Sequence, residues 1–275
     1  EGTNTGGANG VYWLEAIAHR PDGLLVVCNL NQGAKRKVEN IEAALEPDLI
    51  YPLLRGRDVS TWRAVPSAYI LVPRRQNVQE KAVPEDEMQV VYPKTFAYLS
   101  HFREALDARR DAVLMRSKGK IPFYSIGAVN DYTFAPYKVV WREQAARLTT
   151  AVATGGEKPI VPDHKLMLVP FEEPEPAHYL CALLNSSPAQ FVVASYVIEV
   201  STGTHILENV RIPIYNSGDK IHRQLAALSQ QAHAAVAAGQ PVAEIEAEID
   251  RLAAQLWGLT DEELAEIQQS LAELG

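Results

Sequence analysis

The spacing of the apolar residues changes abruptly about four fifths of the way along the chain. Of all features of the sequence, this change constrains the possible folds most. In the last part of the chain, apolar side chains recur every three or four positions, as they do in amphipathic helices. Gly258 follows one such stripe and predicts a helix end. Thr260 and Glu263 then form a capping box that begins a further helix. The sequence therefore predicts a division into residues 1–218 and a helical segment of residues 219–275.

The beginning of the chain predicts a β-hairpin. Residues 11–18 and residues 24–30 are rich in apolar and β-branched side chains, as strands are. Pro21, Asp22 and Gly23 lie between them. This combination favours a tight turn, because proline fixes φ and glycine accepts a positive φ. We expect this hairpin to be the first element of a sheet.

Further elements follow in an order typical of mixed folds. Pro93 begins a run with apolar residues three and four apart, which predicts a helix that ends near Arg110. Ser187 is expected to cap a helix that begins at Pro188. The other predictions are strands at residues 69–72, 139–141, 148–153, 166–169 and 210–214, and helices at residues 177–184 and 188–197. We expect an α/β (α+β) fold with a twisted, largely antiparallel sheet, peripheral helices and a helical C-terminal segment.

The composition excludes several classes of protein. Of the 275 residues, 47% are hydrophobic, enough for one large core or two smaller ones. The most apolar long stretch, residues 179–200, is interrupted by Asn185 and Glu199, which argues against a membrane span. Cys28 and Cys181 lie far apart in apolar sequence and are expected to be buried free thiols in a reducing compartment. The first ten residues resemble no signal peptide, so we expect a cytoplasmic protein without membrane contact, cut from a longer chain.

The charge is distributed unevenly. The formal net charge of −8 argues by itself against a polyanionic partner. Residues 55–147, however, contain 16 basic and 10 acidic residues, whereas residues 219–275 contain 3 and 10. One face of the molecule can therefore attract a polyanion. The alternative is that Arg103, Arg109 and Arg110 only form the solvated face of a helix.

Residues suited to catalysis are present without forming a complete set. The glycine-rich residues 2–10 lack the Gly-Lys-Ser/Thr of a phosphate loop. His164 follows Asp163, and His205 follows the Thr-Gly-Thr of residues 202–204, but neither has a Ser or Cys nucleophile elbow. We therefore expect no metal site and no catalytic centre in this chain. Ligand contact or structural support is the expected role of the two histidines.

Several short motifs occur in an informative order. They are TGGANGVY at residues 5–12, PLLRGRDV at 52–59, YP at 92–93 before YL at 98–99, YKVV at 137–140, YLCALLNS at 179–186, STGTH at 201–205 and VRIP at 210–213. Together they resemble the target recognition domain of adenine-specific DNA methyltransferases of restriction-modification systems, of the type IIG and TaqI-like kinds. The resemblance covers nearly the whole chain, and its Leu-Asn-Ser and Ile-Pro elements are also similar to type I specificity subunits.

The resemblance implies a role in DNA recognition. In that family this domain grips duplex DNA and reads a target sequence, while the adenine is flipped into the S-adenosylmethionine site of a methyltransferase domain. The present chain has no Asn/Asp-Pro-Pro-Tyr/Phe motif. We therefore expect duplex DNA binding, no methylation by this chain alone and no cofactor of its own. S-adenosylmethionine is expected in a methyltransferase domain, present in cis or as a separate subunit.

The basic and aromatic residues of the central region are the candidate DNA contacts. Residues in regular segments are assigned to phosphates, and they are Arg57, Arg63, Lys94 and Lys138. Residues in less regular segments are assigned to base edges, and they are Arg74, Arg75, Lys118, Lys120 and Tyr124. Arg55 and Arg57 can instead pair with Asp58 in their own turn.

Two alternatives stay open at this point. The C-terminal helices can dock a partner, which would make the chain a protein-interaction module of a modification complex without DNA affinity of its own. The chain can also be an enzyme that uses His164 or His205, which predicts turnover that one histidine substitution abolishes.

Overall fold

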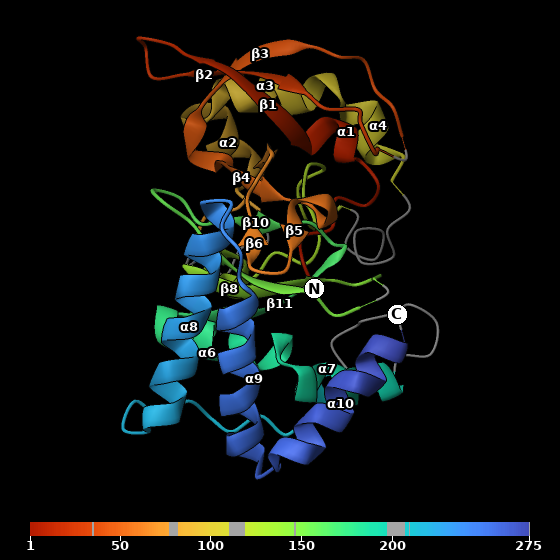
Figure 1. Cartoon of the computed structure of the whole chain (residues 1–275). Coiled ribbons are helices and arrows are strands. Elements are labelled where there is room, and N and C mark those ends of the chain that lie inside the picture. The colour runs from red at the N-terminus through yellow and green to blue at the C-terminus, as the bar shows by residue number, and fades with distance from the viewer. Residues whose placement is uncertain are drawn as a thin grey trace.

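The molecule consists of two lobes, each with a sheet and helices, and we call them the upper and the lower layer (Figure 1). The computed structural model describes residues 1–34, 36–76, 82–109, 119–145, 147–196, 207–208 and 210–274. The upper layer contains the N-terminal sheet, and the lower layer contains a second sheet and the C-terminal helices. The mixed α/β architecture, the mainly antiparallel pairing and the helical C-terminal region confirm the expected fold class.

A mixed sheet forms the upper layer. Its strands are β1 (Trp13–His19), β2 (Leu25–Asn29), β3 (Glu42–Leu45), β4 (Ile50–Leu54), β7 (Ala68–Leu71) and β10 (Val161–Pro162). Within the described residues they lie in the order β10, β4, β7, β1, β2, β3. All neighbours are antiparallel except β10 and β4, which are parallel. Because β10 comes from the middle of the chain, it fastens that part of the sequence to the N-terminal sheet.

The predicted hairpin is present but begins later. β1 and β2 pair antiparallel, and Gly23 in their turn has φ +85°, which glycine adopts without strain. The short helix α1 (Asn9–Tyr12) replaces the first residues of the expected strand. The Val11 carbonyl accepts a hydrogen bond from the Tyr98 hydroxyl at 2.6 Å. This tertiary contact is not visible in the local sequence.

Short helices cover the upper sheet. They are α2 (Glu85–Val91), α3 (Pro93–His101) and α4 (Arg103–Asp107), and the one-turn helices η1 (Pro47–Leu49), η2 (Gly56–Asp58) and η3 (Asp131–Phe134) lie in the connections. The Glu46 carboxylate caps α3 by accepting the Lys94 and Thr95 N–H groups at 2.9 and 2.8 Å. The single helix expected from Pro93 to Arg110 is interrupted at Phe102, where ψ is 14°. Arg110 itself lies outside the described residues.

The lower layer is built around β8. In the described residues, β8 (Tyr137–Arg142) lies between β9 (Thr150–Thr154) and β11 (Leu166–Phe171), with antiparallel pairing on both sides. The small hairpin of β5 (Val59–Ser60) and β6 (Arg63–Ala64) lies between the two layers. Helix α6 (Pro174–Asn185) packs on this sheet and leads to α7 (Ser187–Tyr196).

The predicted C-terminal helices are present, and the predicted capping residues lie at their ends. They are α8 (Lys220–Ala237), α9 (Ala243–Trp257) and α10 (Asp261–Glu273). Gly258 ends α9 with φ 72°, and Thr260 and Glu263 cap each other's backbone N–H groups. α8 lies along α6, and their apolar residues form one core with the lower sheet. The domain division near residue 218 stays a prediction.

Two local predictions are wrong. Residues 210–214 do not form a strand. Their backbone is held by side chains instead, since the Arg211 carbonyl accepts the Trp257 indole N–H at 2.9 Å. Ser187 does not cap its own helix, because its N–H and hydroxyl donate to the Asp250 carboxylate of α9 at 2.6 and 2.5 Å.

Three further properties bear on the sequence predictions. Cys28 and Cys181 are free, with Cys181 buried and Cys28, contrary to expectation, only partly buried. None of the described helices combines the length and the apolar character needed to cross a bilayer. The described residues contain no group of three or more His, Cys, Asp or Glu side chains placed to hold a metal ion.

Candidate nucleic-acid interface

A cavity opens beside η2, and we call it the η2 cavity. It has a volume of about 600 Å³ and is bordered by the N-terminal turn, the loop after β2, η2 and the turn between β10 and β11. Its cationic lining residues are Arg36, Arg55, Arg57 and Lys165, and its carboxylate is Asp163. Positive charge is therefore concentrated here in a chain of net charge −8.

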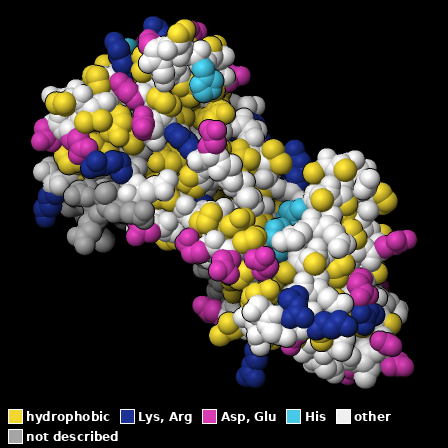
Figure 2. Space-filling model, turned by 90° about the vertical axis from the view of Figure 1, so that its left-hand side faces the viewer, with side chains coloured by type: hydrophobic (Ala, Val, Ile, Leu, Met, Phe, Trp, Pro, Cys, Tyr) yellow, Lys and Arg dark blue, Asp and Glu magenta, His cyan; other side chains and the backbone are white. Residues whose placement is uncertain are grey.

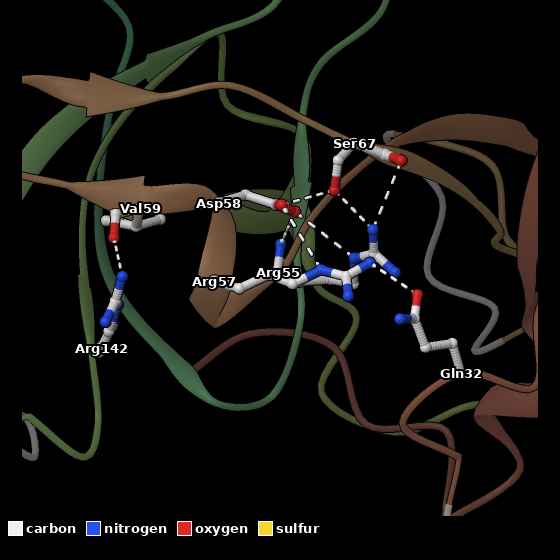
Figure 3. A network of polar contacts seen from close by, with 7 residues as sticks. All are labelled: Gln32, Arg55, Arg57, Asp58, Val59, Ser67 and Arg142. Carbon is white, nitrogen blue, oxygen red and sulfur yellow. Dashed lines mark hydrogen bonds and ion pairs between the residues drawn. The ribbon is translucent and has the colours of Figure 1, made fainter.

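The sequence LRGRD at residues 54–58 builds one wall. β4 ends at Leu54, and Asp58 closes the η2 turn by accepting the Arg55 N–H at 2.9 Å. Asp58 also accepts the Ser67 hydroxyl at 2.5 Å, and the same hydroxyl accepts from Arg55 at 2.5 Å (Figure 3). Arg142 of β8 donates to the Val59 carbonyl at 2.5 Å and fastens the turn to the lower sheet.

Arg55 and Arg57 differ although one residue separates them. Arg55 is buried, and its Nε lies 3.5 Å from Asp58 Oδ2. Burial, and next the nearby Arg57 charge, lower the pKa of Arg55, while Asp58 opposes this shift. The Arg57 side chain is 51% exposed, lies 3.9 Å from Asp58 and donates to Gln32 at 3.2 Å (Figure 3). Arg55 therefore holds the turn, and Arg57 presents a cation to the surroundings.

The turn between β10 and β11 builds a second wall. Asp163 is buried and accepts the His164 N–H at 2.8 Å, and its Oδ1 lies 2.6 Å from His164 Nδ1. The Asp163 N–H donates to the Leu54 carbonyl at 2.8 Å, which ties this wall to the end of β4. Lys165, the next residue along the turn, is exposed. His164 thus has a carboxylate partner and no described nucleophile in the lining.

Trp13 adds an aromatic surface to the cavity. It is buried, and the Arg55 guanidinium lies 5.7 Å from the centre of its ring, within the range of a cation–π interaction. The indole Nε1 has no hydrogen-bond partner among the described residues. A buried N–H without an acceptor costs free energy of folding.

The exposed candidate residues are dispersed over the molecule. Arg57 alone among them lines the η2 cavity. Lys120 borders a different cavity of about 470 Å³, and Lys94 one of about 400 Å³. Arg75 is paired with Glu87 at 2.8 Å. Arg63 is exposed on β6, and Lys118 lies outside the described residues.

Three of the residues assigned to DNA are buried, which corrects the expectation that they face the surface. The Tyr124 hydroxyl donates to the Val83 carbonyl at 2.7 Å, and burial raises the pKa of Tyr124. Arg74 donates to the Val129 carbonyl and lies 3.6 Å from Asp131. Burial lowers the pKa of Lys138 to about 8, and its ammonium group donates to the Ala135 carbonyl. These side chains stabilise loops from inside.

Arg109 is buried too, so the alternative of a solvated arginine face is wrong for this residue. Its guanidinium donates to the carbonyls of Ser125 at 2.7 Å, Phe123 and Thr5. These acceptors lie in two segments remote from α4. The buried arginine therefore connects the helical cover to the N-terminal turn beside the η2 cavity.

The cavity lining also includes Arg36, Lys165 and Trp13, which were not among the residues predicted from the sequence. Arg36 lies after β2 and donates to the Ala108 carbonyl at 2.6 Å. The run Asp163-His164-Lys165 comes directly after a short strand, and polar residues at strand ends often line sites. That signal could have indicated Lys165, but the pairing of β10 with β4, which brings it to Arg57, involves residues far apart in sequence.

The comparisons with known proteins agree with the sequence motifs at a coarse level. No family model matches the chain. The chain is 27% identical over 192 residues, 68% of its length, to the type II methyltransferase M.NspV of Nostoc sp.. The match covers 38% of that protein, so the chain spans less than two fifths of the relative's length. The chain is a distant homologue of a type II methyltransferase.

Proposed function

We propose that this chain binds duplex DNA sequence-specifically, as the target recognition part of an adenine-specific DNA methyltransferase of a restriction-modification system. The observation that carries the proposal is the similarity to a type II methyltransferase over 68% of the chain. A methyltransferase that acts at defined DNA sequences needs a part that reads bases in the grooves. The motifs of this chain resemble that part and contain no catalytic Asn/Asp-Pro-Pro-Tyr/Phe.

The charge distribution supports DNA as the partner. Arg57, Arg36 and Lys165 border one cavity, and all three are at least partly exposed. Exposed cations that neutralise phosphates release counterions and provide sequence-independent affinity. On the side shown in Figure 2, acidic side chains gather between the two lobes, while Lys and Arg side chains lie on both lobes. In this proposal the DNA backbone passes over the η2 cavity, and Arg63 adds a contact from β6.

The chemistry of methylation is assigned to a part that this chain does not contain. In our proposal, a methyltransferase domain in cis or as a subunit binds S-adenosylmethionine and receives the flipped adenine. The residues of this chain orient the duplex and select the sequence. Their positions on two short turns fastened to both sheets suit this role, since rigid elements hold contacting side chains in register.

Selection from a randomised duplex pool tests the proposal. The purified chain is expected to enrich a short motif, and its affinity should fall steeply as the salt concentration rises. Arg57→Gln should reduce retention, whereas Arg251→Gln is the matched control, because Arg251 is 53% exposed and also ion-paired but lies on acidic α9. Absence of duplex binding at low salt, together with tight association with a methyltransferase subunit, would favour the protein-interaction alternative.

A further inference from the structure

Trp62, at the turn between β5 and β6, has a backbone conformation that is rare for its side chain. Its φ is 60°, in the left-handed region, where a bulky side chain crowds the backbone. The turn between β1 and β2 has a glycine at such a position, Gly23 with φ +85°. A strained residue persists only where its surroundings over-determine it, and such residues cluster at functional positions. The tryptophan therefore has a reason beyond the turn itself.

Three elements of the lower layer hold Trp62. Its indole N–H donates to the Glu246 carboxylate of α9 at 2.8 Å. Its ring lies edge-on to the His233 ring of α8, with the ring centres 5.6 Å apart. Its backbone N–H donates to the Thr150 carbonyl of β9 at 3.2 Å. Trp62 is buried in the core that these helices form with the lower sheet, so the C-terminal helices anchor a turn from the first quarter of the chain.

The hairpin that Trp62 anchors carries exposed cations. β5 begins at the residue after η2, and the Val65 N–H donates to the Asp58 carbonyl at 3.3 Å, so η2 and the hairpin form one closed unit. Arg57 lies in η2, Arg63 follows Trp62 directly, and both are exposed. The two strands have two residues each, too few for a hairpin that is stable alone. Contacts outside the hairpin must therefore set the position of Arg63.

The two cations depend on Trp62 to different degrees. η2 has hydrogen bonds of its own, because Asp58 accepts from the Arg55 N–H and from the Ser67 hydroxyl. Arg63 lies beyond these bonds and next to Trp62. Loss of the anchor should therefore displace Arg63 and leave η2 in place.

We propose that Trp62 is a positioning residue for DNA contact, which holds Arg63 of β6 against a backbone phosphate of the duplex. The inference rests on the proposed function and extends it to the C-terminal helices. Through Trp62, α8 and α9 support the recognition surface in addition to packing on α6. Neither helix needs to contact DNA for this role.

The salt dependence of duplex binding by the full chain tests this role. Fluorescence anisotropy across a salt series gives the slope of log affinity against log salt, which counts phosphate contacts. A constant unfolded fraction leaves this slope unchanged, so a merely structural role would not move it. Arg63→Gln should make the slope shallower by about 0.9. Trp62→Gly removes the anchor and leaves a residue that accepts a φ of 60°, and it should give a similar change.

The double variant shows whether Trp62 acts through Arg63. Adding Arg63→Gln to Trp62→Gly should change the slope no further, because Arg63 has then already lost its phosphate. A further decrease of about 0.9 in the double variant would overturn the proposal, since Arg63 would still contact DNA without the anchor.

Glu246 provides a matched pair that serves even where Trp62→Gly does not fold. Glu246→Gln keeps an oxygen that can accept the indole N–H, whereas Glu246→Leu removes the acceptor. The leucine variant should have the shallower slope, and the glutamine variant the original one. Trp257→Phe is the control, because it removes another indole hydrogen bond of α9, to the Arg211 carbonyl at 2.9 Å and outside the hairpin. Equal slopes for the two Glu246 variants, or the same change in Trp257→Phe, would contradict the proposal.

The unchanged chain separates this inference from the proposed function. Absence of duplex binding by the unchanged chain at low salt would refute the proposed function and this inference with it. Binding with a steep salt dependence, together with an unchanged slope in Trp62→Gly, would refute the positioning role alone.

Discussion

Two regions of the molecule differ in the charge state of their buried ionisable groups. At the η2 cavity, Arg55 is buried with its counterion Asp58, and charge is kept. Between α6, α8 and β9, His178 and His233 form a histidine junction whose rings lie 5.0 Å apart. Burial lowers the pKa of both histidines, and that of His178 to about 4. The buried arginine thus stays charged beside a cavity that opens to solvent, whereas the two histidines are neutral where helices cover the sheet.

The hydrogen bonds of the junction fix the neutral form. The Val152 N–H donates to His233 Nε2 at 2.9 Å, so that nitrogen must be an acceptor. The proton therefore lies on Nδ1, which donates to the Ser229 carbonyl at 2.7 Å. His178 Nδ1 is 3.0 Å from the Ser229 hydroxyl. The comparison shows a buried ion pair in one region and a neutral, hydrogen-bonded core in the other.

The largest effect is expected from removing the counterion at η2. Asp58→Ala leaves Arg55 buried and unpaired, which should lower the free energy of unfolding by about 3–5 kcal/mol. Asp22→Ala is the control, because Asp22 pairs with Arg20 at the surface and should cost less than about 1 kcal/mol. Urea denaturation measures both. Equal losses would mean that burial does not distinguish the two pairs.

The junction should make stability depend on pH in a defined direction. The pKa of His178 falls from its ordinary 6.5 to about 4 on folding, so below pH 6.5 the unfolded chain binds a proton that the folded chain does not. Stability should therefore be lost as the pH falls from 6.5 to 4, by about 3 kcal/mol from this group at about 1.4 kcal/mol per pKa unit.

His178→Asn checks this assignment. The variant removes the titrating ring, so its urea midpoint should fall less between pH 7 and pH 4.5 than that of the unchanged chain. The Asp58→Ala chain should keep the full dependence, because the histidines remain. Parallel pH profiles for His178→Asn and the unchanged chain would contradict the role of His178.

A neutral hydrogen bond in the junction should matter less than the buried ion pair. Ser229→Ala removes the hydroxyl beside His178 Nδ1 and leaves a buried ring nitrogen without that partner. The expected loss is about 1–3 kcal/mol. Urea denaturation at pH 7 measures it, where both histidines are neutral. A loss larger than that of Asp58→Ala would reverse the order of the two regions.

The smallest effect on stability is expected at Arg57. Its exposed pairing with Asp58, at 3.9 Å, should contribute little, so Arg57→Gln should change the free energy of unfolding by less than about 0.5 kcal/mol. The same variant should weaken DNA binding clearly. Thermal and urea unfolding check the first statement, and a large destabilisation would assign Arg57 to the structure of the turn.

Local signals predicted the elements whose structure is determined locally. The capping box at Thr260 and Glu263 and the helix end at Gly258 are confirmed, because their bonds join residues three or four apart. The hairpin turn at Gly23 is confirmed for the same reason. These features depend on local backbone geometry, which the capping side chains stabilise and which glycine adopts without strain.

The site could be predicted only in part, because burial of polar groups depends on distant partners. Lys138 and Arg109 look like surface cations in sequence, yet both are buried and donate to backbone carbonyls of loops. Arg57 is exposed, and its contact with DNA stays a prediction. Lys165 and Trp13 reach the same cavity only because β10 pairs with β4 and β1 lies in the same sheet.

The salt dependence of duplex binding tests the central claim most directly. Fluorescence anisotropy across a salt series gives the slope of log affinity against log salt for the unchanged chain, Arg57→Gln and Arg251→Gln. Loss of one phosphate contact should make the slope of Arg57→Gln shallower by about 0.9, while Arg251→Gln keeps the original slope. Identical slopes for all three chains, or a change in Arg251→Gln alone, would contradict the assignment of the η2 cavity to DNA.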